Sequence, residues 1–277
     1  MLLNFIMEKL KVLVAKLGTK VGIYSYNYQN QKVFALNEHQ EFVAASSIKV
    51  FLLDMFLDYL LTNKIDLFSL RELNLEDRVE DSPWFDEFIK SNNHASYLDI
   101  LHSMITVSDN TSTNIIIDLL GFHNISRYLN LLYPSTKINR KMCDFESRSK
   151  GIDNFTTPFE MFKFFDSIYD FNELDIYTDL KKYNYTKLNW KNKYDTLMKI
   201  ISEQKDLEKI PSGIEDKNTL ILNKPGELDK IRNDSGIILS SDNNIFISIF
   251  AEGIFEEDIS DFLLAEITKE LFNHLRS

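Results

Sequence analysis

Apolar residues recur at helical spacing near both ends of the chain. In residues 3–17 they fall at Leu3, Ile6, Leu10, Leu13 and Leu17. This period predicts an amphipathic helix, and glycine at position 18 is a residue type that ends helices. Residues 257–274 show a similar period, so we expect a second amphipathic helix there.

Strand-like runs lie just inside these two helices. Residues 21–28 and 32–36 predict two strands around a turn at 29–31. Three further strands are expected at 219–222, 231–239 and 245–251, with a turn at 242–244. The middle of the chain predicts helices instead, at 47–63 and across 97–133 with breaks near Asp109 and Gly121.

Strands near both ends of a chain with a helical middle are most simply combined into one antiparallel sheet. We therefore predict an α/β (α+β) fold, with the terminal helices on the sheet and a separate all-helical lobe. The predicted sheet lobe comprises 1–44 and 215–277, and the helical lobe 45–214, within one fused unit of 1–277. Residues 166–196 hold five tyrosines without Gly or Pro, which indicates a solvated helical insertion or, alternatively, a lid or partner surface.

Composition excludes several classes of protein. Among 277 residues, 13% are aromatic, which excludes a disordered chain. A net charge of −11 argues against nucleic acid as a partner. The sequence contains no run of about 18 apolar residues, so we expect no membrane span. The first residues do not follow the pattern of an export signal, so we expect a cytoplasmic protein, or an exported one if a signal has been removed.

Metal and disulfide chemistry are not indicated by the sequence. Cys143 is the single cysteine, which excludes an internal disulfide and a Cys-based zinc site. The five histidines show no metal-binding spacing. We therefore expect neither a metal nor a cofactor.

The strongest candidate chemistry begins at Ser46, three residues before Lys49. On a helix this spacing puts both side chains on one face, so the lysine amine can reach the serine hydroxyl and act as its base. Two other S-x-x-K copies, Ser147/Lys150 and Ser202/Lys205, lie in charged surroundings and are interpreted as chance. Only the first copy opens a long apolar helix.

Two more motifs follow in order along the chain. Ser108-Asp109-Asn110 precedes a helix, and its alternative interpretation is a simple helix N-cap. Lys224-Pro225-Gly226 follows an apolar strand, and its proline indicates an edge strand.

Together these motifs resemble the signature S-x-x-K, S-D-N and K-[T/S]-G of serine β-lactamases and penicillin-binding proteins. The sequence resembles the class A β-lactamase-like serine hydrolases from about Gly22 onward. Thr156-Thr157-Pro158 is similar to the segment that closes the omega loop of that family, and residues 224–236 are similar to its paired strands beside the site. The family fold, a five-stranded antiparallel sheet plus a helical lobe, agrees with the order derived above.

The resemblance implies a role for each motif residue. Ser46 would be the acylated nucleophile and Lys49 a base. Ser108 would pass a proton to the leaving group, and Asn110 would position Lys49 and the substrate amide. In the third motif, Lys224-Pro225-Gly226, the lysine would support the substrate carboxylate and Ser108.

The strand that carries this third motif would also supply the oxyanion hole. The backbone N–H groups of Ser46 and Glu227, the residue after Gly226, would form it. Arg232 would bind a carboxylate, with a surface ion pair as the equal alternative.

Two departures from the family pattern affect the prediction. Counting back from Thr156 places Cys143 where the family carries its deacylating glutamate, and a small slip would bring in Asp144 or Glu146, of which Glu146 is our candidate. Pro225 stands where the family has a hydroxyl residue, which predicts weaker carboxylate recognition or a different substrate.

We predict a hydrolase that acts on a small molecule, namely a β-lactam, a D-alanyl peptide or an ester. The alternative is a binding protein for β-lactams or peptidoglycan fragments that acylates and stalls, or does not react. A weaker third hypothesis is an interaction protein that uses residues 166–196. The oligomeric state is not predicted.

Overall fold

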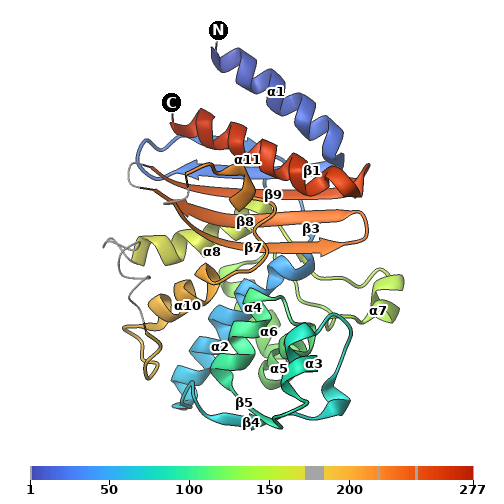
Figure 1. Cartoon of the computed structure of the whole chain (residues 1–277), viewed down its shortest axis with the longest axis vertical. Coiled ribbons are helices and arrows are strands. Elements are labelled where there is room, and N and C mark those ends of the chain that lie inside the picture. Colours follow the sequence, from blue (N-terminus) through green and yellow to red (C-terminus); the bar gives the residue numbers. More distant parts are fainter. Residues whose placement is uncertain (1, 172–183, 217–218, 241–242, 277) are drawn as a thin grey trace. The chain divides into compact units, whose positions relative to one another are not determined.

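The computed structural model describes residues 2–171, 184–216, 219–240 and 243–276 (Figure 1). The chain divides into two compact units. A sheet unit comprises Met1–Ser47, Phe155–Asn172 and Asp206–Ser277, and a helical unit comprises Ile48–Asn154 and Glu173–Lys205. The predicted α+β class with a five-stranded antiparallel sheet is confirmed.

The sheet is built from both ends of the chain, in the order β2-β1-β9-β8-β7. Its strands are β1 (Gly18–Asn27), β2 (Val33–Leu36), β7 (Leu220–Leu228), β8 (Ile231–Leu239) and β9 (Asn244–Ile254). N-terminal β1 pairs with C-terminal β9, with Ile23 opposite Ile249. Strand β7, which carries Lys224-Pro225-Gly226, lies at the edge, as the proline predicted.

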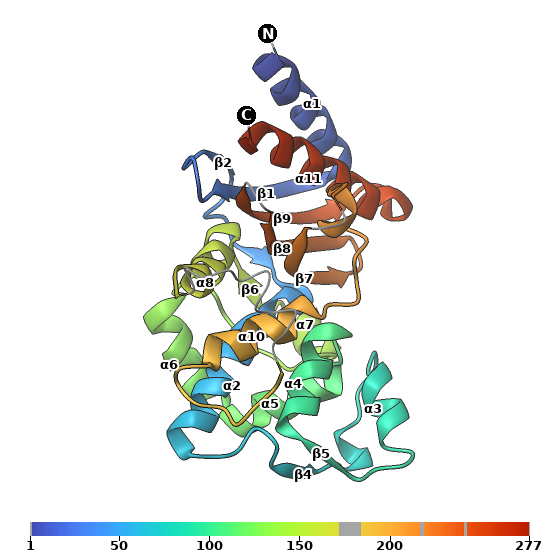
Figure 2. The same ribbon diagram turned by 60° about the vertical axis from the view of Figure 1, so that its left-hand side comes forward.

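Helices cover both faces of this sheet (Figures 1 and 2). Helices α1 (Leu2–Leu17) and α11 (Ser260–Arg276) pack against one another on one face, and α8 (Pro158–Phe171) packs against β9, β1 and β8. Successive side chains of β9 alternate between the two faces of the sheet. Ile247 and Ile249 pack into the core beneath α1 and α11, and Phe246 on the other face contacts α8.

Helix α8 belongs to the sheet unit, whereas the sequence analysis placed residues 158–171 in the helical lobe. The reason is aromatic packing: the rings of Phe162 and Phe165 lie 5.4 and 5.6 Å from that of Phe246. Just before α8, strand β6 (Phe155–Thr156) pairs with β3 (Phe42–Val43). Residues 45–47 and 206–214, with the 3-10 helix η3 (Pro211–Gly213), also join this unit.

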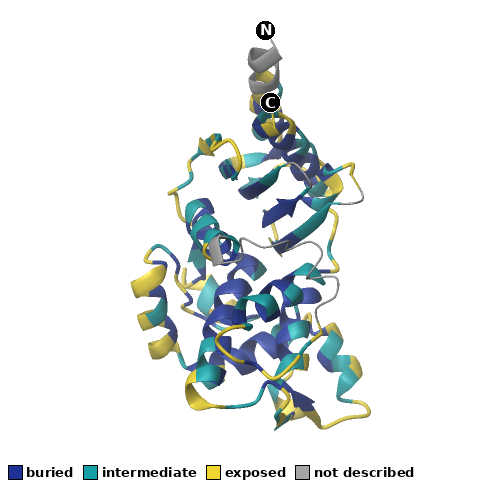
Figure 3. Ribbon diagram, turned by 90° about the vertical axis from the view of Figure 1, so that its left-hand side faces the viewer, coloured by how far each residue is buried: buried dark blue, intermediate teal, exposed yellow. Residues whose placement is uncertain are grey.

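The helical unit is organised around α2 (Lys49–Asn63), which contacts α4, α5, α6 and α10. Ten of its 15 residues are buried, as expected for a helix that is apolar all round, and Figure 3 shows this burial in dark blue. The surrounding helices are α3 (Pro83–Phe88), α4 (Tyr97–Thr106), α5 (Asn110–Leu120), α6 (Phe122–Leu132), α7 (Phe145–Ser149) and α10 (Lys193–Ser202). Strands β4 (Leu70–Glu72) and β5 (His94–Ser96) form a short ladder.

The predicted insertion at 166–196 is divided between the two units. Tyr169 stacks on Tyr28 in the sheet unit, and Tyr185 donates to Glu203 in the helical unit. Tyr177 and Tyr183 lie outside the described residues, as does Asp242 of the predicted hairpin turn. Among the described helices, none combines the length and apolar character needed to cross a membrane.

Candidate active site

Lys49, the first residue of α2, is fully buried in the helical unit. Its Nζ donates to the Ser108 carbonyl oxygen at 2.6 Å, to Ser108 Oγ at 3.1 Å and to Asn110 Oδ1 at 2.8 Å. A buried cation at a helix N-terminus is unfavourable unless acceptors compensate it. The S-D-N motif supplies those acceptors, so the structure joins two motifs that are about sixty residues apart in sequence.

The S-D-N segment also caps a helix, so both interpretations of the motif hold. Asp109 is the N-cap of α5: its carboxylate accepts from the N–H groups of Ser112 and Phe85. Ser108 has a φ of 58°, a left-handed conformation that costs a non-glycine residue of order 1 kcal/mol. This turn directs both the carbonyl and the hydroxyl of Ser108 to Lys49.

Asn110 links the lysine to Cys143. While its Oδ1 accepts from Lys49, its Nδ2 donates to Cys143 Sγ at 3.3 Å and to the carbonyl oxygen of Glu80. The thiol itself donates to the Glu80 carbonyl oxygen at 3.4 Å. Burial raises the pKa of the Cys143 thiol, so the sulfur beside Asn110 is a neutral S–H and not an activated nucleophile.

The two acidic residues after Cys143 are used elsewhere in the same unit. Asp144 is the N-cap of α7, and its hydrogen bonds to Ser147 hold its pKa below the usual range. The side chain of Glu146 is 81% exposed and pairs with Lys150. Among the described contacts neither carboxylate reaches Lys49, Ser108 or Asn110, and a catalytic role for Glu146 stays a prediction.

In the sheet unit, Ser46 lies in the 3-10 turn η1 (Ala45–Ile48), which runs directly into α2. Ser46 is half-buried, whereas Ser47 is fully buried and donates through Oγ to the Ala44 carbonyl oxygen at 2.6 Å. Ser46 is therefore the accessible serine of the pair. Ala45 before it has a φ of 48°, which marks a second strained backbone position beside the motifs.

Edge strand β7 packs directly against the backbone of the serine turn. A Cβ added to Gly226 would lie 2.7 Å from the Ser47 nitrogen, 2.8 Å from the Ala44 carbonyl oxygen and 3.0 Å from the Ser46 nitrogen. No side chain fits there, which explains glycine at this position. Asn233 of β8 also holds this segment in place, because its side-chain amide donates to the carbonyl oxygens of Val43 and Ala44.

Lys224 is the buried cation of β7, and its Nζ donates to the Pro225 carbonyl oxygen at 3.1 Å. Burial lowers the pKa of its amine to about 8, an effect that the negative charge of Asp234 partly opposes. Asp234 on β8 is also fully buried, and burial raises the pKa of its carboxyl group to about 7. Near neutral pH both groups are thus close to their titration points.

Arg232 makes the ion pair that was its alternative interpretation. Its guanidinium donates to the carbonyl oxygens of Leu228 and Ile231 at 2.9 Å and pairs with Glu257 at 3.2 Å and Asp261 at 3.6 Å. Glu227, directly opposite Arg232 in the β7–β8 ladder, pairs instead with Lys209. Carboxylate binding by Arg232 stays a prediction.

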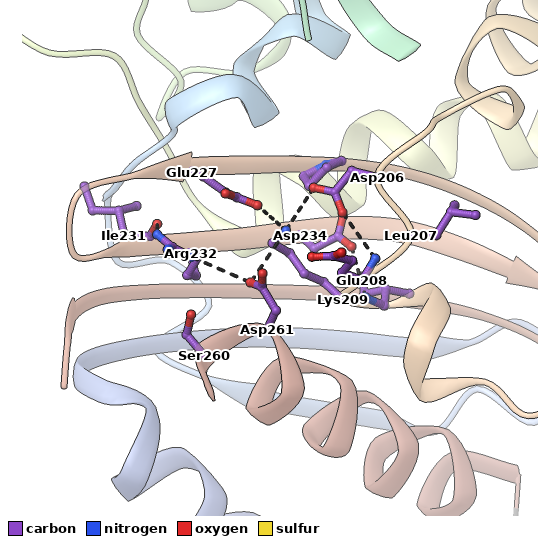
Figure 4. Close-up of polar contacts among 12 residues, drawn as sticks. Asp206, Leu207, Glu208, Lys209, Glu227, Ile231, Arg232, Asp234, Ser260 and Asp261 are labelled. Atoms are coloured by element: carbon purple, nitrogen blue, oxygen red, sulfur yellow. Dashed lines mark hydrogen bonds and ion pairs between the residues drawn. The ribbon is translucent and has the colours of Figure 1, made fainter. Parts of the chain in front are cut away.

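Lys209, Asn233 and the Glu80 carbonyl oxygen were not among the groups predicted from the sequence. Lys209 has a side chain only 1% exposed and pairs with Asp206 at 2.9 Å, with Asp261 at 3.6 Å and with Glu227 (Figure 4). A charged residue before Ile210-Pro211 carries no pattern that reveals burial. No cluster of three or more His, Cys, Asp or Glu residues suited to a metal occurs in the described parts of the chain.

Comparison with known protein families identifies the family of this chain. The family model described as the Beta-lactamase enzyme family matches residues 6–275. A search of curated proteins finds no match.

Solved structures share the fold at low sequence identity. A β-lactamase from Chitinophaga pinensis is 20% identical, with a TM-score of 0.82 over 98% of this chain and 99% of that chain. A β-lactamase from Sphaerobacter thermophilus is 18% identical, with a TM-score of 0.80 over 98% and 97%. The structure titled PBP-A is 19% identical, with a TM-score of 0.81 over 98% and 96%.

These solved structures show the fold, and the family match, which spans nearly the whole chain, shows the kind of protein. The chain belongs to the Beta-lactamase enzyme family and is a β-lactamase-like hydrolase.

Proposed function

We propose that this hydrolase acts by acyl transfer through a covalent ester on Ser46, with a β-lactam or a related amide or ester as acyl donor. The observation that carries the proposal is the contact of Lys49 Nζ with Ser108 Oγ, Ser108 O and Asn110 Oδ1. A buried lysine held against a second hydroxyl is suited to moving protons to and from a serine nucleophile.

In the acylation step Lys49 acts as a neutral amine: Ser46 Oγ attacks the acyl carbon, and its proton passes to the lone pair of Lys49 Nζ. The bond from the carbonyl carbon to the leaving nitrogen or oxygen then breaks. The proton reaches the leaving atom through Ser108, whose hydroxyl is in hydrogen-bond contact with Lys49. The products are an ester on Ser46 and a protonated leaving group, so atoms and charge balance.

The negative charge that develops on the carbonyl oxygen needs fixed donors. The packing of β7 at Gly226 against the turn at 44–47 supports the backbone N–H groups of Ser46 and Glu227 for this role. Both belong to the sheet unit, so the donors are held by one framework before substrate arrives. Losing one such donor typically costs about 10²- to 10³-fold in rate.

A second candidate function follows from Cys143. Hydrolysis of the ester needs a base that activates water, and the residue in contact with Asn110 is a neutral thiol. This favours an acyl-enzyme that forms and then persists, as in a penicillin-binding protein. A variant of PBP-A solved as an acyl-enzyme complex with penicillin G supports acylation by penicillin on this fold.

The test is to follow the mass of the intact protein during incubation with a fluorescent penicillin and, separately, with an activated ester. A transient mass increase supports turnover, and a permanent one supports the stalled acyl-enzyme. Both labels should be absent in Ser46→Ala.

Ser47→Ala is the matched control, because it removes the neighbouring hydroxyl and should keep the label. Labelling of Ser46→Ala, or no labelling of the native protein by either donor, would overturn the proposal.

A further inference from the structure

Strand β7 borders the nucleophile, so its side chains decide what an acyl donor meets on that flank. The backbone at Gly226 lies against the nitrogens of Ser46 and Ser47. Successive side chains of a strand alternate between faces, so Pro225 and Glu227 project to the same side. In the β7–β8 ladder Pro225 is opposite Asp234, and Glu227 is opposite Arg232.

The proline removes the first possible donor on this flank. Pro225 has neither a backbone N–H nor a hydroxyl. A threonine or serine there would offer an O–H donor to an anionic group on the substrate.

The arginine on this flank is already neutralised. The Arg232 side chain is only 13% exposed and pairs with both Glu257 and Asp261. Its Nη1 donates to the carbonyl oxygens of Leu228 and Ile231. A substrate carboxylate would have to displace two protein carboxylates from this guanidinium.

The lysine next to it is neutralised in the same way. Lys209 pairs with Asp206, Glu227 and Asp261 (Figure 4). Burial lowers the pKa of its amine, but Glu227 and Asp206 outweigh that effect and raise it. The Glu227 side chain is 44% exposed, so its carboxylate, although paired with Lys209, remains accessible beside the proposed oxyanion donor. In this network four carboxylates, those of Asp206, Glu227, Glu257 and Asp261, face three cations, namely Lys209, Arg232 and Lys230.

We propose that the acyl donor carries no carboxylate on the flank that lies along β7, so that the preferred substrate is an ester or amide that is uncharged there. Like charges repel, and an anion on this flank would meet the Glu227 carboxylate with neither a hydroxyl at position 225 nor an uncompensated Arg232 to offset it. Lys224 is next to Pro225 in the strand, so its side chain projects to the other side and does not serve this flank. The inference rests on the proposed acylation of Ser46 and names its substrate class.

The experiment compares benzylpenicillin with its methyl ester, two donors with the same reactive ring that differ in one negative charge. The rate of mass labelling at Ser46 is measured for both at low ionic strength. The methyl ester should label at least as fast as the free acid. A tenfold or greater preference for the free acid would overturn the inference and leave the proposed function intact.

Variants then test the cause. Pro225→Thr adds a hydroxyl, and Glu257→Gln releases Arg232 from one carboxylate. Each should raise the acid-to-ester rate ratio by about tenfold, the usual effect of one hydrogen bond to a charged group. Asp258→Asn is the matched control, because it removes a neighbouring charge that makes no described ion pair with Arg232, and the ratio should not move.

The proposed function and this inference fail under different outcomes. If neither donor nor a neutral activated ester labels Ser46, the proposed function fails and this inference falls with it. If both variants leave the rate ratio unchanged while their circular dichroism and melting temperature stay native, selectivity arises elsewhere and the inference alone is overturned.

Discussion

The Asn110 amide nitrogen lies 3.3 Å from Cys143 Sγ, while the oxygen of the same amide accepts from Lys49. One side chain therefore links the proposed base to the loop position at which a deacylating group is expected. Because the thiol is neutral, it cannot take a proton from water, and the identity of residue 143 should set the lifetime of the acyl-enzyme.

Replacing Cys143 by glutamate should speed the loss of the acyl group from Ser46. A carboxylate beside Asn110 could act as a general base, a contribution that is typically about 10²- to 10⁴-fold. The measurement is the decay of the labelled mass after excess penicillin is removed. Cys143→Gln is the control, since glutamine has the same size as glutamate but cannot act as a base. Equal decay in the two variants would show that position 143 does not reach the ester.

Lys49→Met should abolish acylation without unfolding the protein. Methionine fills a similar volume but removes the amine, so labelling should slow by about 10²-fold or more. Ser108 O, Ser108 Oγ and Asn110 Oδ1 lose their donor, so the melting temperature should fall while the fold is kept, which circular dichroism checks. Lys199→Met, in the partly buried pair with Glu203, is the control and should label normally. Normal labelling of Lys49→Met would exclude the lysine as the base.

Gly226→Ala should reduce acylation because its Cβ would collide with the serine turn. The added carbon would lie 2.7 Å from the Ser47 nitrogen, which is backbone and cannot rotate away. Strand β7 must then shift, which misplaces the Glu227 N–H, and labelling should slow by about 10²-fold.

Gly121→Ala is the comparison: nothing lies within 4 Å of its added Cβ, although its φ of 74° strains alanine. Gly121→Ala should therefore lose about 1 kcal/mol of stability and keep its labelling rate. If Gly226→Ala labels as fast as the native protein, the packing of β7 against the turn does not determine the reaction.

Periodicity predicted most of the fold because each helix or strand leaves a local signature. The breaks near Asp109 and Gly121 separate α4, α5 and α6, and the edge position of β7 followed from one proline. The partner of an element leaves no such signature, so α8 was assigned to the wrong unit. Its Phe162 and Phe165 are apolar in either environment, and only the structure shows that they meet Phe246.

Spacing and order along the sequence selected Ser46, Lys49, Ser108, Asn110 and Lys224 as candidates. Of these, the structure brings Lys49 into contact with Ser108 and Asn110. The partners of Arg232 could not be predicted, because Glu257 and Asp261 reach it from other elements of the fold. Lys209 illustrates the same limit: its burial depends on three carboxylates, one before it, one on β7 and one on α11.

Asp234→Asn should change how the free energy of unfolding depends on pH. Burial raises the pKa of this carboxyl group from 3.8 to about 7 in the folded protein. Between these two values the folded state holds a proton that the unfolded state has lost, so native stability falls as pH rises from about 4 to about 7, by at most ~1.4 kcal/mol per pH unit. Asparagine cannot titrate, and its single amide oxygen keeps one of two hydrogen bonds, because the Ile210 and Ser235 N–H groups donate to different oxygens of Asp234. The stability of Asp234→Asn relative to the native protein should therefore rise across this window and level off above it, which urea unfolding at a series of pH values measures.

Lys224 does not mask the effect, because its lowered pKa of about 8 places its own contribution above that pH. Asp258→Asn, at an exposed position, should give a curve parallel to that of the native protein, and a parallel curve for Asp234→Asn would show that Asp234 ionises normally inside the sheet.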